Sequence, residues 1–287
     1  MKTTALLLAL ASLITTASAA TTINDPNKYA WGANLGWIDW RGDVASGAVI
    51  GEFVCSGYLY SANCGWIHLG DGTPAGGIHY SNTSGADFGV NHDGTGLLRG
   101  FAYGANIGWI HFEATGNPRF DGTTGRFSGY AWSANCGWVN LGDGSFFVKT
   151  DTVAPGADSD GDGITDAWEV REAGNLTALT AEGDRDGDGA SDLAEYLADT
   201  GPLDPLDALR IVDFARATDG TQVTLAWTSQ PTRRYRIEGN HDLLAPWTLT
   251  LDDILPDAGL TTTRGLALAP DDAKHFYQVR AFRPLSE

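Results

Sequence analysis

The sequence carries four copies of one nine-residue pattern, and this internal repeat constrains the fold more than any other feature. Each copy runs from an aromatic residue through Ala-Asn-x-Gly to a tryptophan, at residues 29–37, 58–66, 101–109 and 130–138. The final tryptophans are 29, 43 and 29 residues apart, so the short units group into two larger units of 72 residues. A fixed period is typical of architectures in which each unit covers its neighbour. We therefore expect residues 20–150 to form one repeat domain.

Each copy predicts a β-hairpin. Aromatic and small residues alternate before the turn, and Trp with Ile or Val follows it, which suits a pleated, half-buried surface. Asn and Gly in the middle tolerate the positive φ angles of tight turns. Two places after each tryptophan stands a polar residue, which shares a face with that tryptophan if the strand keeps its period of two. These residues are Asp39, His68, His111 and Asn140.

The chain has 10 tryptophans, most of them in the repeats. Aromatic residues recur at fixed repeat positions when each unit must bury the next, so we expect these rings to form the core. The alternative is a carbohydrate-binding module, in which exposed tryptophans stack on sugar rings.

Two acidic segments have the spacing of calcium-binding loops. Such a loop places oxygen ligands at positions 1, 3, 5, 7, 9 and 12 around the ion, with glycine at position 6. The first segment supplies Asp158, Asp160, Asp162, Ile164 (through its carbonyl), Asp166 and Glu169, with Gly163 at the turn. The second supplies Asp184, Asp186, Asp188, Ala190 (through its carbonyl), Asp192 and Glu195, with Gly189 at the turn. Two complete matches predict two calcium sites.

The sequence around the loops predicts a loop-then-helix unit rather than a full EF-hand. Pro155 and Gly156 stand where an entering helix would be needed, whereas residues 167–173 and 193–198 can form exit helices. Extracellular calcium modules of this kind bind with dissociation constants of about 10⁻⁴ to 10⁻³ M, so we expect a structural ion.

The charge distribution favours cations as partners. The formal net charge is −18, and residues 158–207 hold 15 acidic residues against only Arg171 and Arg185. Nucleic-acid binding depends on clustered Lys and Arg, so a nucleic-acid partner is not expected. A dense local excess of carboxylates instead requires counter-ions.

The C-terminal region returns to strand patterns. Six short runs with turn residues between them predict a small antiparallel β-sandwich at residues 208–287. The runs are 209–214, 221–228, 234–238, 247–251, 261–268 and 275–282. The fold class is therefore mainly β: an all-β repeat domain, an acidic calcium-loop connector with short helices at 151–207, and a β-sandwich.

The N-terminus predicts export. Lys2 precedes an apolar run and the small-residue site Ala17-Ser18-Ala19, as in a signal peptide covering residues 1–19. We therefore expect a secreted or cell-surface protein without a transmembrane segment. An oxidising compartment allows disulfides among the three cysteines, Cys55, Cys64 and Cys136, and the pairings 55–64 and 64–136 and three free thiols all stay open.

Sequence motifs give little support to catalysis. The chain has no Gly-x-Ser-x-Gly, phosphate-loop, dinucleotide or His-Glu-x-x-His motif. Glu52, Asp87 and Glu113 are the candidates for a glycosidase carboxylate pair, and a glycan-active hydrolase remains the least favoured alternative. A transition-metal site at His68 and His111, with His79 and His92 nearby, is also less favoured than ordinary surface histidines.

The Asp-x-Asp-x-Asp-Gly-x-x-Asp pattern of both loops resembles the thrombospondin type 3 repeat and is related to dockerin-type calcium loops. Residues 195–205, Tyr235-Arg-Ile-Glu238, Trp247 and Phe276-Tyr-Gln-Val-Arg280 resemble the tail of many exported bacterial proteins, in which a calcium segment precedes a fibronectin-III-like sandwich. The nine-residue repeats resemble those of uncharacterised bacterial extracellular proteins. This likeness implies a secreted or surface role but no particular activity.

Together these features predict a secreted, non-catalytic calcium-binding protein with a structural or adhesive role. Calcium is expected to rigidify the link between two β domains. A glycan or another surface protein is the expected macromolecular partner.

Overall fold

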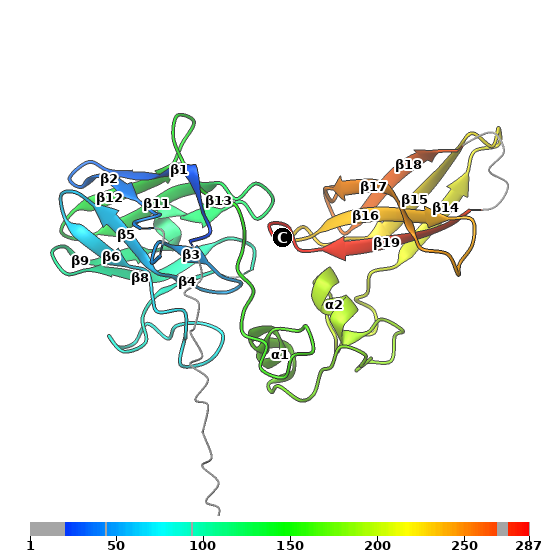
Figure 1. Ribbon diagram of the computed structural model, residues 1–287, viewed down its shortest axis with the longest axis horizontal. Coiled ribbons are helices and arrows are strands. Elements are labelled where there is room, and N and C mark those ends of the chain that lie inside the picture. The colour runs from blue at the N-terminus through cyan, green and yellow to red at the C-terminus, as the bar shows by residue number, and fades with distance from the viewer. Residues whose placement is uncertain (1–20, 44, 93, 269–274, 287) are drawn as a thin grey trace, which may run out of the picture.

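The computed structural model describes residues 21–43, 45–92, 94–268 and 275–286, so the predicted signal peptide lies outside the described residues. The chain is mainly β, as predicted. Figure 1 shows a closed N-terminal sheet, a C-terminal pair of sheets, and a connector with two short helices between them. No helix among the described residues is long and apolar enough to cross a membrane.

The bounds of the strands and helices run in chain order. The N-terminal part contains β1 (Ile23–Gly32), β2 (Gly36–Asp39), β3 (Val49–Ile50), β4 (Cys55–Ser56), β5 (Tyr58–Ser61), β6 (Gly65–His68), β7 (Val90–His92), β8 (Leu98–Gly104), β9 (Gly108–Phe112), a 3₁₀ turn (Ala114–Gly116), β10 (Arg119–Phe120), β11 (Phe127–Ser133), β12 (Gly137–Gly142) and β13 (Val148–Thr150). The rest contains α1 (Asp166–Ala173), α2 (Asp192–Ala198), β14 (Ile211–Arg216), β15 (Gln222–Thr228), β16 (Arg234–Asn240), β17 (Thr248–Ile254), β18 (Thr261–Ala267) and β19 (Phe276–Phe282).

Each sequence repeat forms one hairpin, and the four hairpins close into an eight-stranded antiparallel barrel. The hairpins are β1–β2, β5–β6, β8–β9 and β11–β12. Neighbouring hairpins pair through β2–β5, β6–β8 and β9–β11. The last strand returns to the first, with Trp31 opposite Asn140 and Gly32 opposite Val139, which closes the sheet. Closure leaves no long unpaired edge among the eight described strands of the barrel.

The Ala-Asn-x-Gly turns lie together at one end of the barrel and are joined by a ring of hydrogen bonds. The asparagine amide of each turn donates to the backbone carbonyl of residue x in a neighbouring turn. The bonds run from Asn34 to Cys136, from Asn63 to Leu35, from Asn106 to Cys64 and from Asn135 to Ile107, at 3.0–3.1 Å. The glycine of each turn has φ between 70° and 79°, which a side chain rarely adopts.

Residue x of each turn is buried and fills this end of the barrel interior; we call it the plug. A large plug goes with glycine at the fourth position of the repeat, and a smaller plug goes with serine. The pairs are Gly32 with Leu35, Ser61 with Cys64, Gly104 with Ile107 and Ser133 with Cys136. A Cβ on Gly104 would lie 2.7 Å from Ile107, so the larger plug requires glycine. The alternation of large and small plugs agrees with duplication of a two-hairpin unit.

The prediction that the repeat tryptophans form the core is wrong. The inward positions of the hairpins hold small and aliphatic residues such as Ala30, Ile38, Ala102 and Ile110, all fully buried. The aromatic residues alternate with these and point outward. Five of the repeat tryptophans are 38–50% exposed: Trp31, Trp37, Trp66, Trp109 and Trp138.

The outward rings form one cross-strand pair on each hairpin. Residues three and nine of the repeat face each other at 4.8–5.0 Å between ring centroids, with planes 59–65° apart. The polar residue at position eleven lies opposite the first aromatic of its own hairpin, so it shares the outer face with the tryptophan, as the strand period predicted. His68, for example, stacks on Tyr58 at 4.4 Å.

All three cysteines lie in the described part of the chain and none forms a disulfide. Cys55, Cys64 and Cys136 are free and buried. Burial raises the pKa of the Cys55 thiol to about 12, which keeps it protonated. Of the three alternatives left open by the sequence, the structure therefore has free thiols.

The C-terminal part contains the six predicted strands in two three-stranded antiparallel sheets, β14–β15–β18 and β17–β16–β19. Leu225 and Trp227 of the first sheet pack in one core with Tyr235 and Ile237 of the second. The residues of β16 alternate between buried and half-buried, and those of β15 alternate between buried and more exposed except at Ala226, which is also buried.

Candidate metal centre

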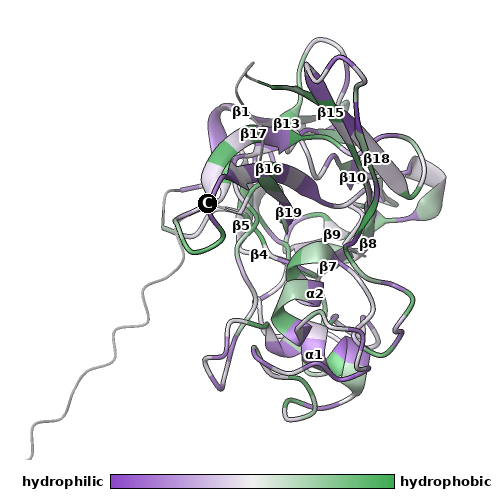
Figure 2. Cartoon of the chain, turned by 90° about the vertical axis from the view of Figure 1, so that its right-hand side faces the viewer, coloured by the Kyte–Doolittle hydropathy of each residue, from purple (hydrophilic) through white to green (hydrophobic). Residues whose placement is uncertain are grey.

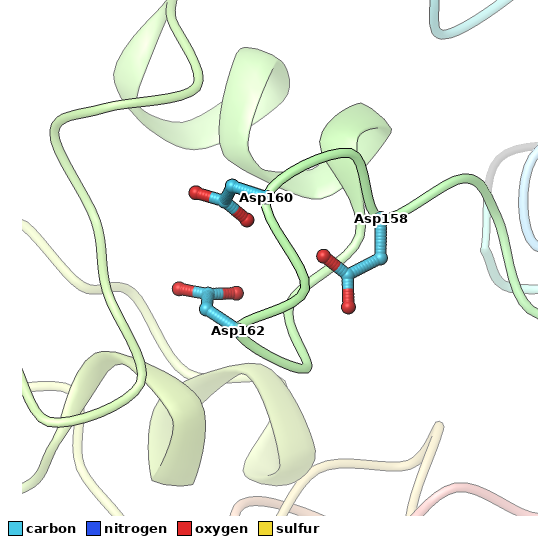
Figure 3. A group of neighbouring side chains, drawn as sticks. All are labelled: Asp158, Asp160 and Asp162. Atoms are coloured by element: carbon cyan, nitrogen blue, oxygen red, sulfur yellow. The ribbon is translucent and has the colours of Figure 1, made fainter. Parts of the chain in front are cut away.

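Among the described residues, two groups of acidic side chains could hold a metal ion, and both lie in the predicted calcium loops. In each loop the carboxylates at positions 1, 3 and 5 bring one oxygen apiece to within 4.8 Å of one another. These residues are Asp158, Asp160 and Asp162 in the first loop and Asp184, Asp186 and Asp188 in the second. Figure 3 shows the first three side chains projecting from a single loop.

The loop backbones are held by the first aspartate of each cluster. One oxygen of Asp158 accepts from the amide of Gly161 at 2.7 Å, and the other accepts from Gly163 at 3.0 Å. Asp184 does the same for Gly187 and Gly189, at 2.8 and 3.0 Å. Gly163 and Gly189 have φ angles of 93° and 96°, which explains why glycine stands at position 6 of both loops.

Exit helices come after the loops, as predicted: α1 begins at Asp166 and α2 at Asp192. Within the described residues 152–165, no helix enters the first loop, which also agrees with the prediction. Both helices end at a residue with left-handed φ, Gly174 and Asp199. In Figure 2 the two helices lie near each other and each carries both hydrophobic and hydrophilic residues.

The glutamates at position 12 provide the strongest indication that the loops suit a cation. Glu169 and Glu195 are both 0% exposed. Neither carboxylate oxygen of either residue has a hydrogen-bond partner among the described residues, and one oxygen each of Asp162 and Asp186 is in the same condition. Buried carboxylates without partners are strongly unfavourable, whereas a divalent cation takes up such oxygens as ligands. The donor set of both loops therefore fits calcium.

Burial and the nearby aspartates also raise the pKa values of these two glutamates. Burial, followed by the negative charges of Asp160 and Asp162, raises the pKa of Glu169 to about 7. Burial, followed by Asp186 and Asp188, raises the pKa of Glu195 to about 8. Without a cation, Glu195 is therefore mostly protonated at neutral pH and Glu169 about half protonated.

The two aspartates predicted at position 9, Asp166 and Asp192, accept hydrogen bonds within the connector. Asp166 accepts from the amide and hydroxyl of Ser159, at 2.7 and 2.6 Å. Asp192 accepts from the amides of Thr180 and Arg185, at 2.9 and 3.0 Å. These bonds hold the start of each loop against its helix. Ligation by these two carboxylates, and by the carbonyls of Ile164 and Ala190, stays a prediction.

The two loop-helix units share one small hydrophobic core. Ile164, from the first loop, packs with Trp168 of α1 and Tyr196 of α2, and the last two rings lie 5.3 Å apart. Phe53, from the barrel domain, belongs to the same cluster. The loops are therefore packed together and against the barrel.

Glu52 joins this core to both β domains, a role that no sequence signal indicated. One of its oxygens accepts from the hydroxyl of Thr165, in the first loop, at 2.7 Å and from that of Tyr196 at 3.3 Å. Its other oxygen lies 2.9 Å from the guanidinium of Arg283, which comes directly after β19. Arg283 also donates to the Tyr196 hydroxyl. We call Glu52, Thr165, Tyr196 and Arg283 the junction.

Two further arginines hold the C-terminal domain to the second loop-helix unit. Arg210, just before β14, donates to Asp188 of the second loop at 2.7 Å. Arg233 is 8% exposed and donates to the carbonyls of Tyr196 and Leu197 at the end of α2. Both loops are thus connected to elements far away in the sequence.

The other candidate residues have local partners. Asp87 accepts from the amides of Ala75 and Ser81, at 3.1 and 2.9 Å, and Glu113 pairs with His111 at 2.9 Å. Among the described residues, the groups able to hold a metal comprise the two aspartate clusters and no histidine. His79 instead contacts the carbonyl of His92.

Comparison with protein-family models, with curated proteins and with solved structures finds no match to this chain. The resemblances noted in the sequence therefore stay predictions.

Proposed function

We propose that this chain is an extracellular, non-catalytic calcium-binding protein with a structural or adhesive role, in which two ions rigidify the connector between two β domains. The observation that carries the proposal is the pair of buried glutamates, Glu169 and Glu195, at the closing position of the two predicted calcium loops, whose oxygens have no hydrogen-bond partner among the described residues. Export, suggested by the N-terminal sequence, would place the protein where calcium is plentiful.

A mechanical role is supported by the contacts of residues in and beside the two loops. Thr165 lies inside the first loop and Tyr196 stands next to the last residue of the second, and both donate to Glu52 of the barrel domain. A cation that fixes the two loops therefore fixes the two hydroxyl donors of the junction. Arg210 extends the connection from the second loop to the C-terminal domain.

A calorimetric calcium titration tests the binding. Wild-type protein, freed of calcium by dialysis, is expected to bind two ions per chain. Glu169→Gln and Glu195→Gln should each lose one ion, because an amide removes one charge and a bidentate ligand from one loop only. Glu172→Gln is the matched control: Glu172 lies on α1 but pairs with Arg171, so both ions should remain. An absence of calcium binding, or two ions bound by both loop variants, would contradict the proposal.

Limited proteolysis tests the rigidity separately. Removal of calcium should expose residues 150–205 to cleavage while the far-ultraviolet signal of the sheets persists, because the barrel and the C-terminal sheets have cores of their own. Equal cleavage with and without calcium would leave a calcium-binding protein but reject the mechanical role.

A further inference from the structure

Two hollows on the outer wall of the barrel share one construction. The first, hollow A, is lined by Lys28, Tyr29, Trp37, Ser145 and Phe146 and has a volume of about 530 Å³. The second, hollow B, is lined by Asn82, Ser84, Phe88, Phe101, Trp109 and His111 and has a volume of about 370 Å³. Both volumes fall in the range of small-molecule sites, about 300–1,000 Å³.

The aromatic geometry is nearly the same in both. In hollow A, Trp37 lies 6.0 Å from Tyr29 and 5.2 Å from Phe146, whose plane is turned by 88°. In hollow B, Trp109 lies 5.9 Å from Phe101 and 5.1 Å from Phe88, whose plane is turned by 83°. Trp37 and Trp109 nevertheless remain 50% and 39% exposed.

The two phenylalanines come from outside the nine-residue repeats. Phe88 lies in the segment between β6 and β7, and Phe146 lies between β12 and β13. In both cases the segment after an even-numbered repeat covers the next odd-numbered one around the barrel. Two loops of different sequence thus place the same ring against equivalent tryptophans.

The even-numbered repeats are built differently, although they carry the same cross-strand pairs. No phenylalanine packs on Trp66 or Trp138 among the described residues; main chain lies there instead. A Cβ on Gly42 would come within 2.8 Å of Trp66, and one on Gly116 within 3.1 Å of Trp138. Stabilisation of the hairpins therefore explains the cross-strand aromatic pairs, which all four hairpins have. It does not explain the two phenylalanines, which pack against Trp37 and Trp109.

We propose that hollows A and B bind sugar residues of a neutral polysaccharide. Aromatic faces beside hydroxyl, amide and imidazole groups suit a pyranose ring, which has apolar C–H faces and a polar rim. His111 lines hollow B; its Nδ1 contacts Glu113 at 2.9 Å, while its Nε2 makes no hydrogen bond to a described residue. This site is independent of the proposed calcium function.

The position of the hollows favours a polymer with repeating units over a protein partner. They belong to the first and third of four hairpins in a closed barrel, so a whole hairpin separates them on either side. A protein interface of standard size covers about 800 Å² of one contiguous face. A chain of identical sugars offers the same ligand to both sites and gains avidity from them. The barrel domain itself, residues 21–150, holds 10 acidic and 6 basic residues, and this net negative charge disfavours an anionic polymer.

Affinity electrophoresis and calorimetry with soluble cellulose ether, arabinoxylan, galactomannan and soluble starch test the proposal, with alginate as the anionic probe. At least one neutral polymer should bind and alginate should not. Trp37→Ala and Trp109→Ala should each weaken binding, and the double variant should weaken it at least tenfold. Trp66→Ala and Trp138→Ala remove the same ring from hairpins without a phenylalanine, so their affinity should stay within about twofold.

A second pair of variants guards against misfolding. Phe88→Ala and Phe146→Ala leave every cross-strand pair intact and should lose binding with an unchanged far-ultraviolet spectrum. The proposal would be overturned if none of the neutral polymers bound, if all four tryptophan variants lost affinity equally, or if alginate alone bound. Self-association abolished by the phenylalanine variants would also overturn it, since the hollows would then hold a second copy of the chain.

Discussion

Four asparagines, one from each hairpin turn, close a ring of hydrogen bonds around the end of the barrel. Replacing Asn106 by Ala breaks one of these bonds and leaves the carbonyl of Cys64 without its donor. A single lost bond of this kind costs about 0.5–1.5 kcal/mol. Urea denaturation should show a loss of this size, whereas Leu244→Ala, at a position that is 95% exposed, should show almost none. No loss for Asn106→Ala would show that the ring contributes nothing to stability.

The buried glutamates make the stability of the calcium-free protein depend on pH. Their pKa values are about 7 for Glu169 and about 8 for Glu195, above the value of an unfolded chain, so the folded state binds protons more tightly. Their contribution is complete below about pH 4.5 and disappears as the pH rises through 7 to 8. The melting temperature of calcium-free protein should therefore fall between about pH 5.5 and pH 8.

The double variant E169Q/E195Q is the control for this effect, because its amides do not titrate and the fall should be much smaller. Calcium should likewise remove most of the fall, since the bound ion replaces the protons. A melting temperature of the calcium-free protein that rises or stays constant over this range would contradict the assignment.

At the residue scale, sequence spacing alone predicted the six carboxylates that the structure brings together. Alternation of aspartates with a glycine at position 6 is a local pattern, and local backbone geometry places these side chains. Glu52 and Arg210 had no such signal, because their partners lie 113 and 22 residues away. Only the tertiary fold creates these contacts.

At the scale of the hairpin, the match between the plug and the fourth residue can be tested by a double-mutant cycle. Gly104→Ser should destabilise the barrel by about 1–3 kcal/mol, because its Cβ would meet Ile107 at 2.7 Å. Adding Ile107→Cys recreates the Ser and Cys pair of the even-numbered repeats. The double variant should be more stable than the sum of the single changes predicts, as measured by urea denaturation. Simple additivity would mean that the two positions do not compete for space.

The hairpins, both exit helices and the six C-terminal strands were predictable because each has a local pattern of period, turn residue or cap. Which face of each hairpin points into the barrel was not predictable. A period of two separates two faces without saying which one is inside. Closure decides it, since an eight-stranded barrel has room for only a narrow core. Ala30 and Ala102 fit that interior, and the large rings of Trp37 and Trp109 take the outer face.

Across the whole molecule, the junction at Glu52 connects parts that would otherwise be held by few contacts. Its side chain lies within reach of three donors, on the two loop-helix units and on the segment after β19. Glu52→Ala removes hydrogen bonds to a charged group, worth about 1.5–3 kcal/mol each at most. We expect scanning calorimetry of the calcium-loaded variant to separate the unfolding of the barrel from that of the connector. A single transition at the wild-type temperature would show that the junction does not couple them.

The central claim is that calcium fixes the connector and with it the arrangement of the two β domains. Small-angle X-ray scattering of one sample, first with calcium and then with excess chelator, tests this claim most directly. With calcium, the distance distribution should have one sharp interdomain component and a definite maximum dimension. Chelation should broaden that component and lengthen the maximum dimension while circular dichroism keeps the sheet signal. Identical scattering curves, from protein shown by calorimetry to bind and release calcium, would contradict the account.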